Sequence, residues 1–144
     1  MKDFTYERDV YYYETDQMGI VHHSNYIRWM EEARLALMEA LSLSYAEMEK
    51  QGILIPVLSV SCEYKVAFRY GDRFRIQIIP LFFNGIKFKV GYRFYDSEGK
   101  LHSTAESGHG FVDASMHPIS LKKSCPDIYE KLLHWVQEAQ ENQL

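Results

Sequence analysis

Residues 73–94 read RFRIQIIPLFFNGIKFKVGYRF, and this stretch decides the fold. Apolar and polar side chains alternate in both halves of it, which is the two-residue period of a strand with one buried face. The halves are joined by Asn84-Gly85, a dipeptide that favours a tight hairpin turn. The stretch therefore predicts two antiparallel strands joined by a hairpin, with the second strand over 86–94.

Strand patterns continue on both sides of this hairpin. Residues 58–66 show the same alternation, and a DSEG turn at 96–99 leads into a less regular strand over about 101–113. A looser alternation over 3–13 predicts one more strand at the start of the chain. Consecutive strands usually pair with each other, so we expect the strands between 58 and 113 to form a four-strand antiparallel meander.

A helical period separates the first strand from the other four. Apolar side chains recur every three or four residues over 26–41, which predicts a long helix with a broad buried face. The helix is expected to begin near Ser24 or Asn25, either of which can cap it, and to end before Gly52. A shorter amphipathic pattern over 128–139 predicts a C-terminal helix. The sequence thus predicts an α+β fold in which an antiparallel sheet wraps around one long central helix, with a short helix at the C-terminus.

Length and composition favour one globular domain over residues 1–144. Hydrophobic residues make up 47% and charged residues 25%, a balance that argues against a disordered chain. The N-terminal MKDFTYERD has no apolar signal core, and no apolar run is long enough to span a membrane, so we expect a cytoplasmic location. Cys62 and Cys125 stand far apart, which predicts neither a disulfide framework nor a zinc site.

Charge is unevenly distributed along the chain. The formal net charge of −4 gives no electrostatic reason to expect nucleic acid as the main partner. Residues 62–100, however, carry eight basic and four acidic side chains, a net charge of +4 that leaves −8 for the remainder. Such a surface can receive a small polyanion, for example a nucleotide-bearing cofactor, although solvated strand faces explain the same charges more simply.

The turn before the long helix, ETDQMGIVHHSNY at 14–26, crowds polar groups into a short segment. Gly19 permits a tight or left-handed backbone, and the free N–H groups at a helix start can bind an oxyanion. Asp16 lies a few residues upstream, so a reacting carbonyl could sit between its carboxylate and those donors, a geometry suited to acyl transfer. The plainer interpretation makes Asp16 a turn residue and makes His22 and His23 structural histidines.

The same segment carries a resemblance. Residues 13–21, YETDQMGIV, followed by His23, Asn25 and Tyr26, are similar to the signature of the 4-hydroxybenzoyl-CoA thioesterase family, in particular its broad bacterial acyl-CoA thioesterase branch. Residues 55–72, IPVLSVSCEYKVAFRYGD, resemble the strand that follows the helix in that family. The order of the predicted elements also matches the hotdog fold of the family, so the resemblance covers nearly the whole chain.

The resemblance implies an acyl-CoA thioesterase that releases a free carboxylic acid and coenzyme A, with no metal or redox cofactor. Asp16 would be the catalytic carboxylate, acting as nucleophile or general base, and the backbone N–H at His23 would polarise the thioester carbonyl. The family also implies a homodimer, often assembled into a homotetramer, whose sheets join edge to edge and whose active sites lie between subunits. Acyl-carrier protein is the other thiol carrier that the resemblance leaves open.

Contacts with the acyl group and coenzyme A are expected from Tyr13, Gly19, Tyr26, Lys65, Arg69 and Lys87. Some members of the family carry a basic run near the hairpin that helps to hold the nucleotide phosphates. Here that stretch reads FFNGIKFK, and only Lys87 and Lys89 stand close to it. Lys65 or Arg69 is therefore the alternative source of these contacts.

Two other functions stay open at this point. A hotdog hydroxyacyl dehydratase would pair His23 with Glu31 or Glu32, which lie about one turn into the helix, and it would leave Asp16 without a role. A non-catalytic acyl-binding protein would keep the fold and use Asp16 only as a turn residue. The thioesterase interpretation gives a role to the whole motif and is therefore preferred.

Overall fold

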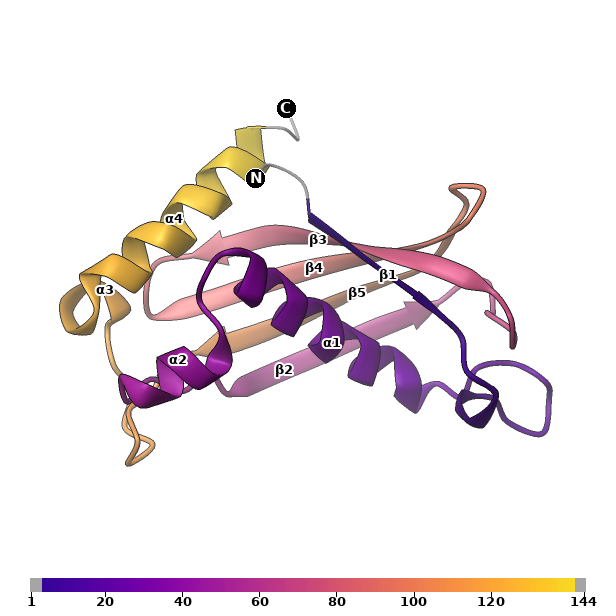
Figure 1. Cartoon of the computed structure of the whole chain (residues 1–144), viewed down its shortest axis with the longest axis horizontal. Coiled ribbons are helices and arrows are strands. Elements are labelled where there is room, and N and C mark those ends of the chain that lie inside the picture. Colours follow the sequence, from indigo (N-terminus) through magenta and orange to yellow (C-terminus); the bar gives the residue numbers. More distant parts are fainter. Residues whose placement is uncertain (1–3, 142–144) are drawn as a thin grey trace.

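The computed structural model describes residues 4–141, and its centre is one five-stranded antiparallel sheet of order β1-β3-β4-β5-β2 (Figure 1). The strands are β1 (Phe4–Asp9), β2 (Val57–Tyr64), β3 (Arg73–Phe83), β4 (Lys87–Asp96) and β5 (Leu101–Gly110). The helices are the 3-10 helix η1 (Tyr12–Glu14), α1 (Ser24–Ala40), α2 (Tyr45–Lys50), α3 (Leu121–Ser124) and α4 (Pro126–Glu141). Helix α1 crosses one face of the sheet, which is the hotdog arrangement that the resemblance implied.

The predicted meander is correct for β3, β4 and β5 and wrong for β2. Strand β2 pairs with β5 at the edge of the sheet, with Cys62 opposite Ala105, and β1 occupies the other place beside β3. Residues 65–72 carry the chain from β2 to β3 without pairing the two strands. The alternation along a strand shows which of its faces is buried but not which strand it pairs with. The order of the strands in the sheet could therefore not be predicted from periodicity.

The hairpin between β3 and β4 forms as predicted. Gly85 adopts a φ of +85°, and the Asn84 side chain accepts hydrogen bonds from the N–H groups of Ile86 (2.9 Å) and Lys87 (2.8 Å). The ladder shifts register between Pro80 and Phe82. Because proline has no N–H to donate, a local break in the ladder is the expected response.

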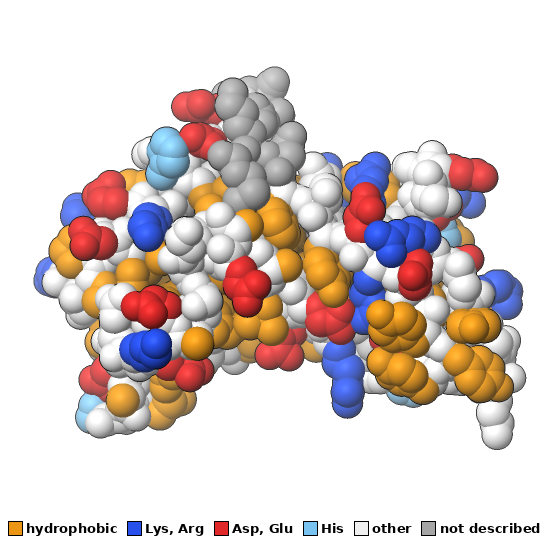
Figure 2. All heavy atoms as spheres, viewed as in Figure 1, with side chains coloured by type: hydrophobic (Ala, Val, Ile, Leu, Met, Phe, Trp, Pro, Cys, Tyr) orange, Lys and Arg blue, Asp and Glu red, His pale blue; other side chains and the backbone are white. Residues whose placement is uncertain are grey.

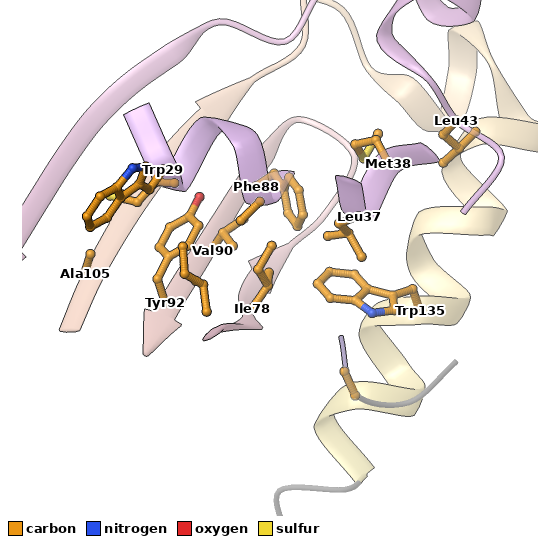
Figure 3. Packing of buried hydrophobic residues seen from close by; sticks show 14 of the residues in the cluster. Trp29, Leu37, Met38, Leu43, Ile78, Phe88, Val90, Tyr92, Ala105 and Trp135 are labelled. Carbon is orange, nitrogen blue, oxygen red and sulfur yellow. The ribbon is translucent and has the colours of Figure 1, made fainter. Parts of the chain in front are cut away.

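The apolar stripe of α1 packs on the sheet and forms the core. Trp29, Met30 and Ala33 have no exposed surface, and burial of side chains as large as the first two stabilises a fold by about 1.5–3 kcal/mol each. Figure 3 shows Leu37 of α1 and Trp135 of α4 at one end of this core, with Trp29 at the other. This packing fixes the position of α1 on the sheet and therefore the place of its first turn.

Helix α1 ends earlier than the limit that the sequence placed at Gly52. It stops at Ala40, and Ser42 takes a φ of +61°, which breaks the helical path. Ser44 then caps α2, because its side-chain oxygen accepts a hydrogen bond from the N–H of Glu47 (3.2 Å). The segment before Gly52 is therefore two helices joined by a tight turn.

The start of α1 agrees with the prediction, but its cap does not. His23 occupies the N-cap position and makes no side-chain capping bond. Instead, Nδ1 of His22 accepts a hydrogen bond from the N–H of Ser24 (3.2 Å). The prediction that Ser24 or Asn25 caps the helix is wrong, since the side chain of Asn25 is directed to another partner, the carbonyl oxygen of Glu14.

Three other boundaries differ from the sequence pattern. Strand β1 ends at Asp9 rather than near residue 13, because the 3-10 helix η1 begins at Tyr12, and β5 ends at Gly110. Helix α4 is longer than the apolar pattern over 128–139 that predicted it. Within residues 4–141, no helix is both long and apolar enough to cross a membrane.

Strand β2 is an edge strand that exposes apolar side chains. The exposed fractions of Val57, Leu58, Val60 and Tyr64 are 51%, 56%, 42% and 48%. One side of β2 pairs with β5, and none of the described strands pairs with the other side. An edge strand of this kind offers unpaired N–H and C=O groups to another chain.

A chain of polar side chains lies buried between α1 and the sheet. Arg34 donates a hydrogen bond to the Tyr92 hydroxyl (3.0 Å), which contacts the Ser107 hydroxyl at 2.6 Å, and this hydroxyl meets Nε2 of His109 at 2.7 Å. His109 is 2% exposed. Burial and the nearby Arg34 charge lower the pKa of His109 to about 4.

This pKa predicts a loss of stability in mild acid. The pKa of His109 is about 6.5 in the unfolded chain and about 4 in the folded chain, so between these pH values only the unfolded chain is protonated there. The free energy of unfolding therefore falls as the pH falls. The contribution of His109 to the free energy of unfolding should decrease by about 2 kcal/mol when the pH is lowered from 7.5 to 5. Urea unfolding of wild type and His109→Gln at both pH values measures it, and equal losses in the two proteins would contradict the assignment.

Candidate active site

The segment between η1 and α1 is a short hairpin loop beside the first turn of α1 (Figure 1). Thr15 and Val21 form an isolated antiparallel bridge at its base, and the N–H of Asp16 donates to the carbonyl of Ile20 at 2.9 Å. Gly19 has a φ of +78°, a conformation that strains any other side chain. The left-handed backbone expected at Gly19 is therefore confirmed, and it returns the chain towards the helix.

Asp16 is half-buried at the start of this loop. One oxygen of its carboxylate, Oδ1, accepts a hydrogen bond from the N–H of Met18 (2.8 Å) and holds the turn. Among residues 4–141, the other oxygen has no hydrogen-bond partner. Asp16 is thus a turn residue, as the plainer interpretation expected, and it also keeps one carboxylate oxygen free for chemistry.

His23 carries the free backbone donor at the start of α1. The neighbouring N–H groups are used, since that of His22 donates to the carbonyl of Glu14 (2.8 Å) and that of Ser24 donates to His22 Nδ1 (3.2 Å). The N–H of Asn25 donates to the His22 carbonyl at 3.0 Å. Within the described part of the chain, the N–H of His23 has no acceptor, and the positive end of the α1 dipole adds to its ability to bind an oxyanion.

Tyr64 at the end of β2 holds the carbonyl side of His23. Its hydroxyl donates a hydrogen bond to the His23 carbonyl at 3.2 Å. Burial and the neighbouring Cys62 raise the pKa of Tyr64 to about 12, so the hydroxyl stays protonated and remains a donor at neutral pH. Sequence reasoning missed Tyr64, because a tyrosine in an alternating strand has the same pattern as a core residue.

Three of the predicted contact residues lie at the loop: Gly19 is part of it, and Arg69 and Tyr13 lie beside it. Arg69 reaches it directly, with Nη1 at 3.4 Å from the carbonyl oxygen of Gly19. Tyr13 is 80% exposed in η1, beside Tyr11 and Tyr12. Figure 2 shows a patch of hydrophobic side chains at this end of the molecule, where Figure 1 places η1 and the loop.

The other predicted contact residues are placed differently. Tyr26 is 2% exposed and packs in the core against Trp29. Lys65 is exposed directly after Tyr64. Lys87 begins β4 at the end of the sheet where β2 starts, whereas the loop lies at the end where β2 finishes. Within one chain, Lys87 is therefore separated from the loop.

The two helix carboxylates considered for a dehydratase have different surroundings. Both oxygens of Glu32 accept hydrogen bonds from Arg8 at 2.8 Å, and one of them also accepts from the Tyr6 hydroxyl at 2.8 Å. Glu31 is exposed on α1. Arg8 also binds Glu14 beneath the loop (2.6 Å), a buried pair that sequence reasoning missed because both side chains stand in polar segments.

The family model of the thioesterase-like superfamily matches residues 10–136 of this chain. The chain belongs to that superfamily. The match spans the loop, α1 and the whole sheet except β1, so the predicted resemblance is confirmed at the level of the superfamily.

Individual relatives agree with this assignment. YneP of Bacillus subtilis (strain 168) is 43% identical over 129 residues, which cover 87% of this chain and 94% of YneP. The acyl-CoA thioester hydrolase YbgC of Escherichia coli O157:H7 is 28% identical, with 80% of this chain and 87% of YbgC covered. The crystal structure of a DHNA-CoA thioesterase from Staphylococcus aureus superposes with a TM-score of 0.91 at 30% identity and covers 100% of this chain and 97% of that one.

Proposed function

We propose that this protein is an acyl-CoA thioesterase, which uses water to cleave a thioester into a free carboxylic acid and coenzyme A. One observation carries the proposal: a single loop presents a carboxylate oxygen of Asp16 and the N–H of His23, both without partners among the described residues. Relatives named as an acyl-CoA thioester hydrolase and a DHNA-CoA thioesterase support the reaction class. Within the thioesterase-like superfamily, we also propose that the chain belongs to the 4-hydroxybenzoyl-CoA thioesterase family.

The mechanism follows from these two groups. The N–H of His23 donates to the thioester oxygen as negative charge develops on it. Asp16 either attacks the carbonyl carbon, forming an anhydride that water then hydrolyses, or takes a proton from water as the water attacks. In both routes the carbon–sulfur bond breaks, the thiolate of coenzyme A leaves and takes up a proton, and one water molecule is consumed in forming the carboxylic acid. Water is the only co-reactant, so the proposal needs no metal or redox cofactor.

Substrate contacts are proposed from the exposed residues near the loop. Arg69, which reaches the Gly19 carbonyl, and the exposed Lys65 would meet the phosphates of coenzyme A. Tyr13 beside the loop and Gly19 within it would border the acyl group. Lys87 can take part only if a second subunit brings it to the site. An acyl-carrier protein is the alternative carrier, and a cytoplasmic location stays a prediction.

The hydroxyacyl dehydratase is the weaker alternative. Its pairing of His23 with a helix carboxylate would need Glu32, which is already bonded to Arg8 and Tyr6, or the exposed Glu31. It also leaves the free oxygen of Asp16 without a role.

The test is release of free thiol from a panel of short, long and aromatic acyl-CoA esters. Wild-type protein should hydrolyse at least one class with turnover well above the rate without protein, and the best substrate names the acyl class. Binding of several esters without thiol release from any of them would favour the non-catalytic acyl-binding protein instead.

We also propose that the protein acts as a homodimer joined along β2, with further assembly into a tetramer. The support is the unpaired edge of β2 and its exposed Val57, Leu58 and Val60. An antiparallel pairing of two β2 edges would bring the start of β2 in one subunit beside Tyr64 and the loop of the other. Lys87 would then approach the partner's Asp16 loop from across the interface.

Val60→Lys is expected to disrupt this dimer, because a lysine on an edge strand opposes pairing with another strand. Sedimentation should give at least twice the 17.0 kDa chain mass for wild type and a single chain mass for the variant, with loss of thioesterase activity. Ile86→Lys, at a side chain of similar exposure (49%) in the β3–β4 hairpin, is the matched control. A wild-type monomer with full activity would overturn the proposed interface.

A further inference from the structure

The carboxylate of Glu14 is buried at the base of the Asp16 loop. It is 4% exposed and accepts three hydrogen bonds from three parts of the chain. Oε1 accepts from Arg8 in β1 (2.6 Å) and from the backbone N–H of Tyr11 (2.8 Å), and Oε2 accepts from the indole N–H of Trp29 in α1 (2.7 Å). Two of the three donors, Arg8 of β1 and Trp29 of α1, belong to elements that pack in the fold, so the fold sets the position of this carboxylate.

The backbone carbonyl of Glu14 binds the opposite side of the loop. It accepts from the N–H of His22 at 2.8 Å and from the side-chain amide of Asn25 at 2.8 Å. One residue therefore ties the outgoing strand of the loop to its returning strand and to the first turn of α1. The bond to His22 also removes that N–H from competition, which leaves the N–H of His23 as the free donor.

The charge of Glu14 is balanced locally. The guanidinium of Arg8 lies between Glu14 and Glu32 and over the rings of Tyr11 (4.6 Å to the centroid) and Trp29 (5.2 Å). A buried carboxylate held in this way is rigid, because moving it would separate an ion pair in a low-dielectric environment. The rigidity passes to residues 15–22 through the two bonds at the Glu14 carbonyl.

We propose that Glu14 is a positioning residue for the reaction, holding the Asp16 carboxylate and the His23 N–H in their relative positions through the base of the loop. The inference rests on the proposed thioesterase function. Glu14 does not touch the substrate, and its effect is on the geometry of the groups that do. Because a misplacement of about 1 Å in a reacting group can cost on the order of 10²-fold in rate, a loosened loop base should act on kcat more than on KM.

The test compares Glu14→Gln with Glu32→Gln. Glutamine keeps the size of Glu14, but its NH2 group would face a donor, either Arg8 or Trp29, and weaken the network. We expect kcat to fall by roughly 30- to 100-fold with KM changed by less than about threefold. Glu32→Gln is the matched control. The substitution removes the other carboxylate that binds Arg8, and Glu32 itself makes none of the contacts that hold the loop. Glu32→Gln should lower thermal stability less than Glu14→Gln does, because the Glu32 side chain is 38% exposed, and it should lower kcat by less than about threefold.

Trp29→Phe is a second variant, in case Glu14→Gln folds poorly. It keeps an aromatic ring in the core and removes the single N–H that binds Oε2 of Glu14. An intermediate loss of kcat, roughly tenfold, is expected. Unchanged kcat in Glu14→Gln, or equal losses in Glu14→Gln and Glu32→Gln, would overturn the positioning role. If the wild-type protein releases no thiol from any acyl-CoA ester, the proposed function fails instead, and this result does not depend on the Glu14 variants.

Discussion

Asp16→Asn is expected to lower kcat for acyl-CoA hydrolysis by about a hundredfold or more, which corresponds to roughly 3 kcal/mol of transition-state stabilisation. Asparagine keeps the size of the side chain, and its amide oxygen can still accept the hydrogen bond from the N–H of Met18, so the turn should be preserved. What is lost is the free, charged oxygen that serves as nucleophile or base. Thiol release under saturating substrate measures the loss.

A matched control separates this effect from a general effect of changing a turn aspartate. Asp113 also accepts backbone hydrogen bonds in a turn, from the N–H groups of Ser115 (2.9 Å) and His117 (3.0 Å), but it lies outside the loop. Asp113→Asn should change kcat by less than about threefold. Full activity in Asp16→Asn would remove Asp16 from the mechanism, and an inactive variant that still binds acyl-CoA would place the defect in the chemical step.

The sequence predicted those parts of the fold that depend on local patterns. The alternation around Asn84-Gly85 identified the hairpin, because a strand with one buried face repeats its apolar residues every second position. In the structure, the apolar residues on one face of β4 are indeed buried. The pairing of β2 with β5 was missed, since the partner of a strand depends on the path of residues 65–72 and on competition with β1, and neither leaves a periodic signal.

The candidate site shows the same division. Asp16, Gly19 and His23 were found because the motif lies in one short segment, and a tight turn before a helix brings such residues together. Glu14 and Tyr64 were missed because their contacts join parts of the chain that are distant in sequence. A glutamate beside a polar turn looks solvated until the fold supplies Arg8 and Trp29 as its partners. Lys87 was grouped with the loop on the resemblance alone, and the strand register separates the two within one chain.

His23→Pro is expected to lower kcat by about 10²- to 10³-fold, because it removes one oxyanion donor, the backbone N–H, together with the exposed imidazole. The φ of His23 is −55°, within the range that proline adopts, and proline is well tolerated at the first positions of a helix. Within residues 4–141 the N–H of His23 has no acceptor, so the substitution breaks no internal hydrogen bond. Thermal stability should therefore stay close to wild type while activity is lost.

The control is His23→Ala, which deletes the imidazole and keeps the N–H. The His23 ring is exposed and stacks on His22 at 4.2 Å, so its removal should cost less than about fivefold in kcat. Because Asp16 is unchanged in both variants, the comparison isolates the backbone donor from the side chain at one position. If alanine and proline reduce kcat equally, the imidazole is the active group and the dehydratase pairing of His23 with a helix carboxylate regains support. If His23→Pro leaves kcat intact, another group must polarise the carbonyl of the thioester, and the first turn of α1 has only a structural role.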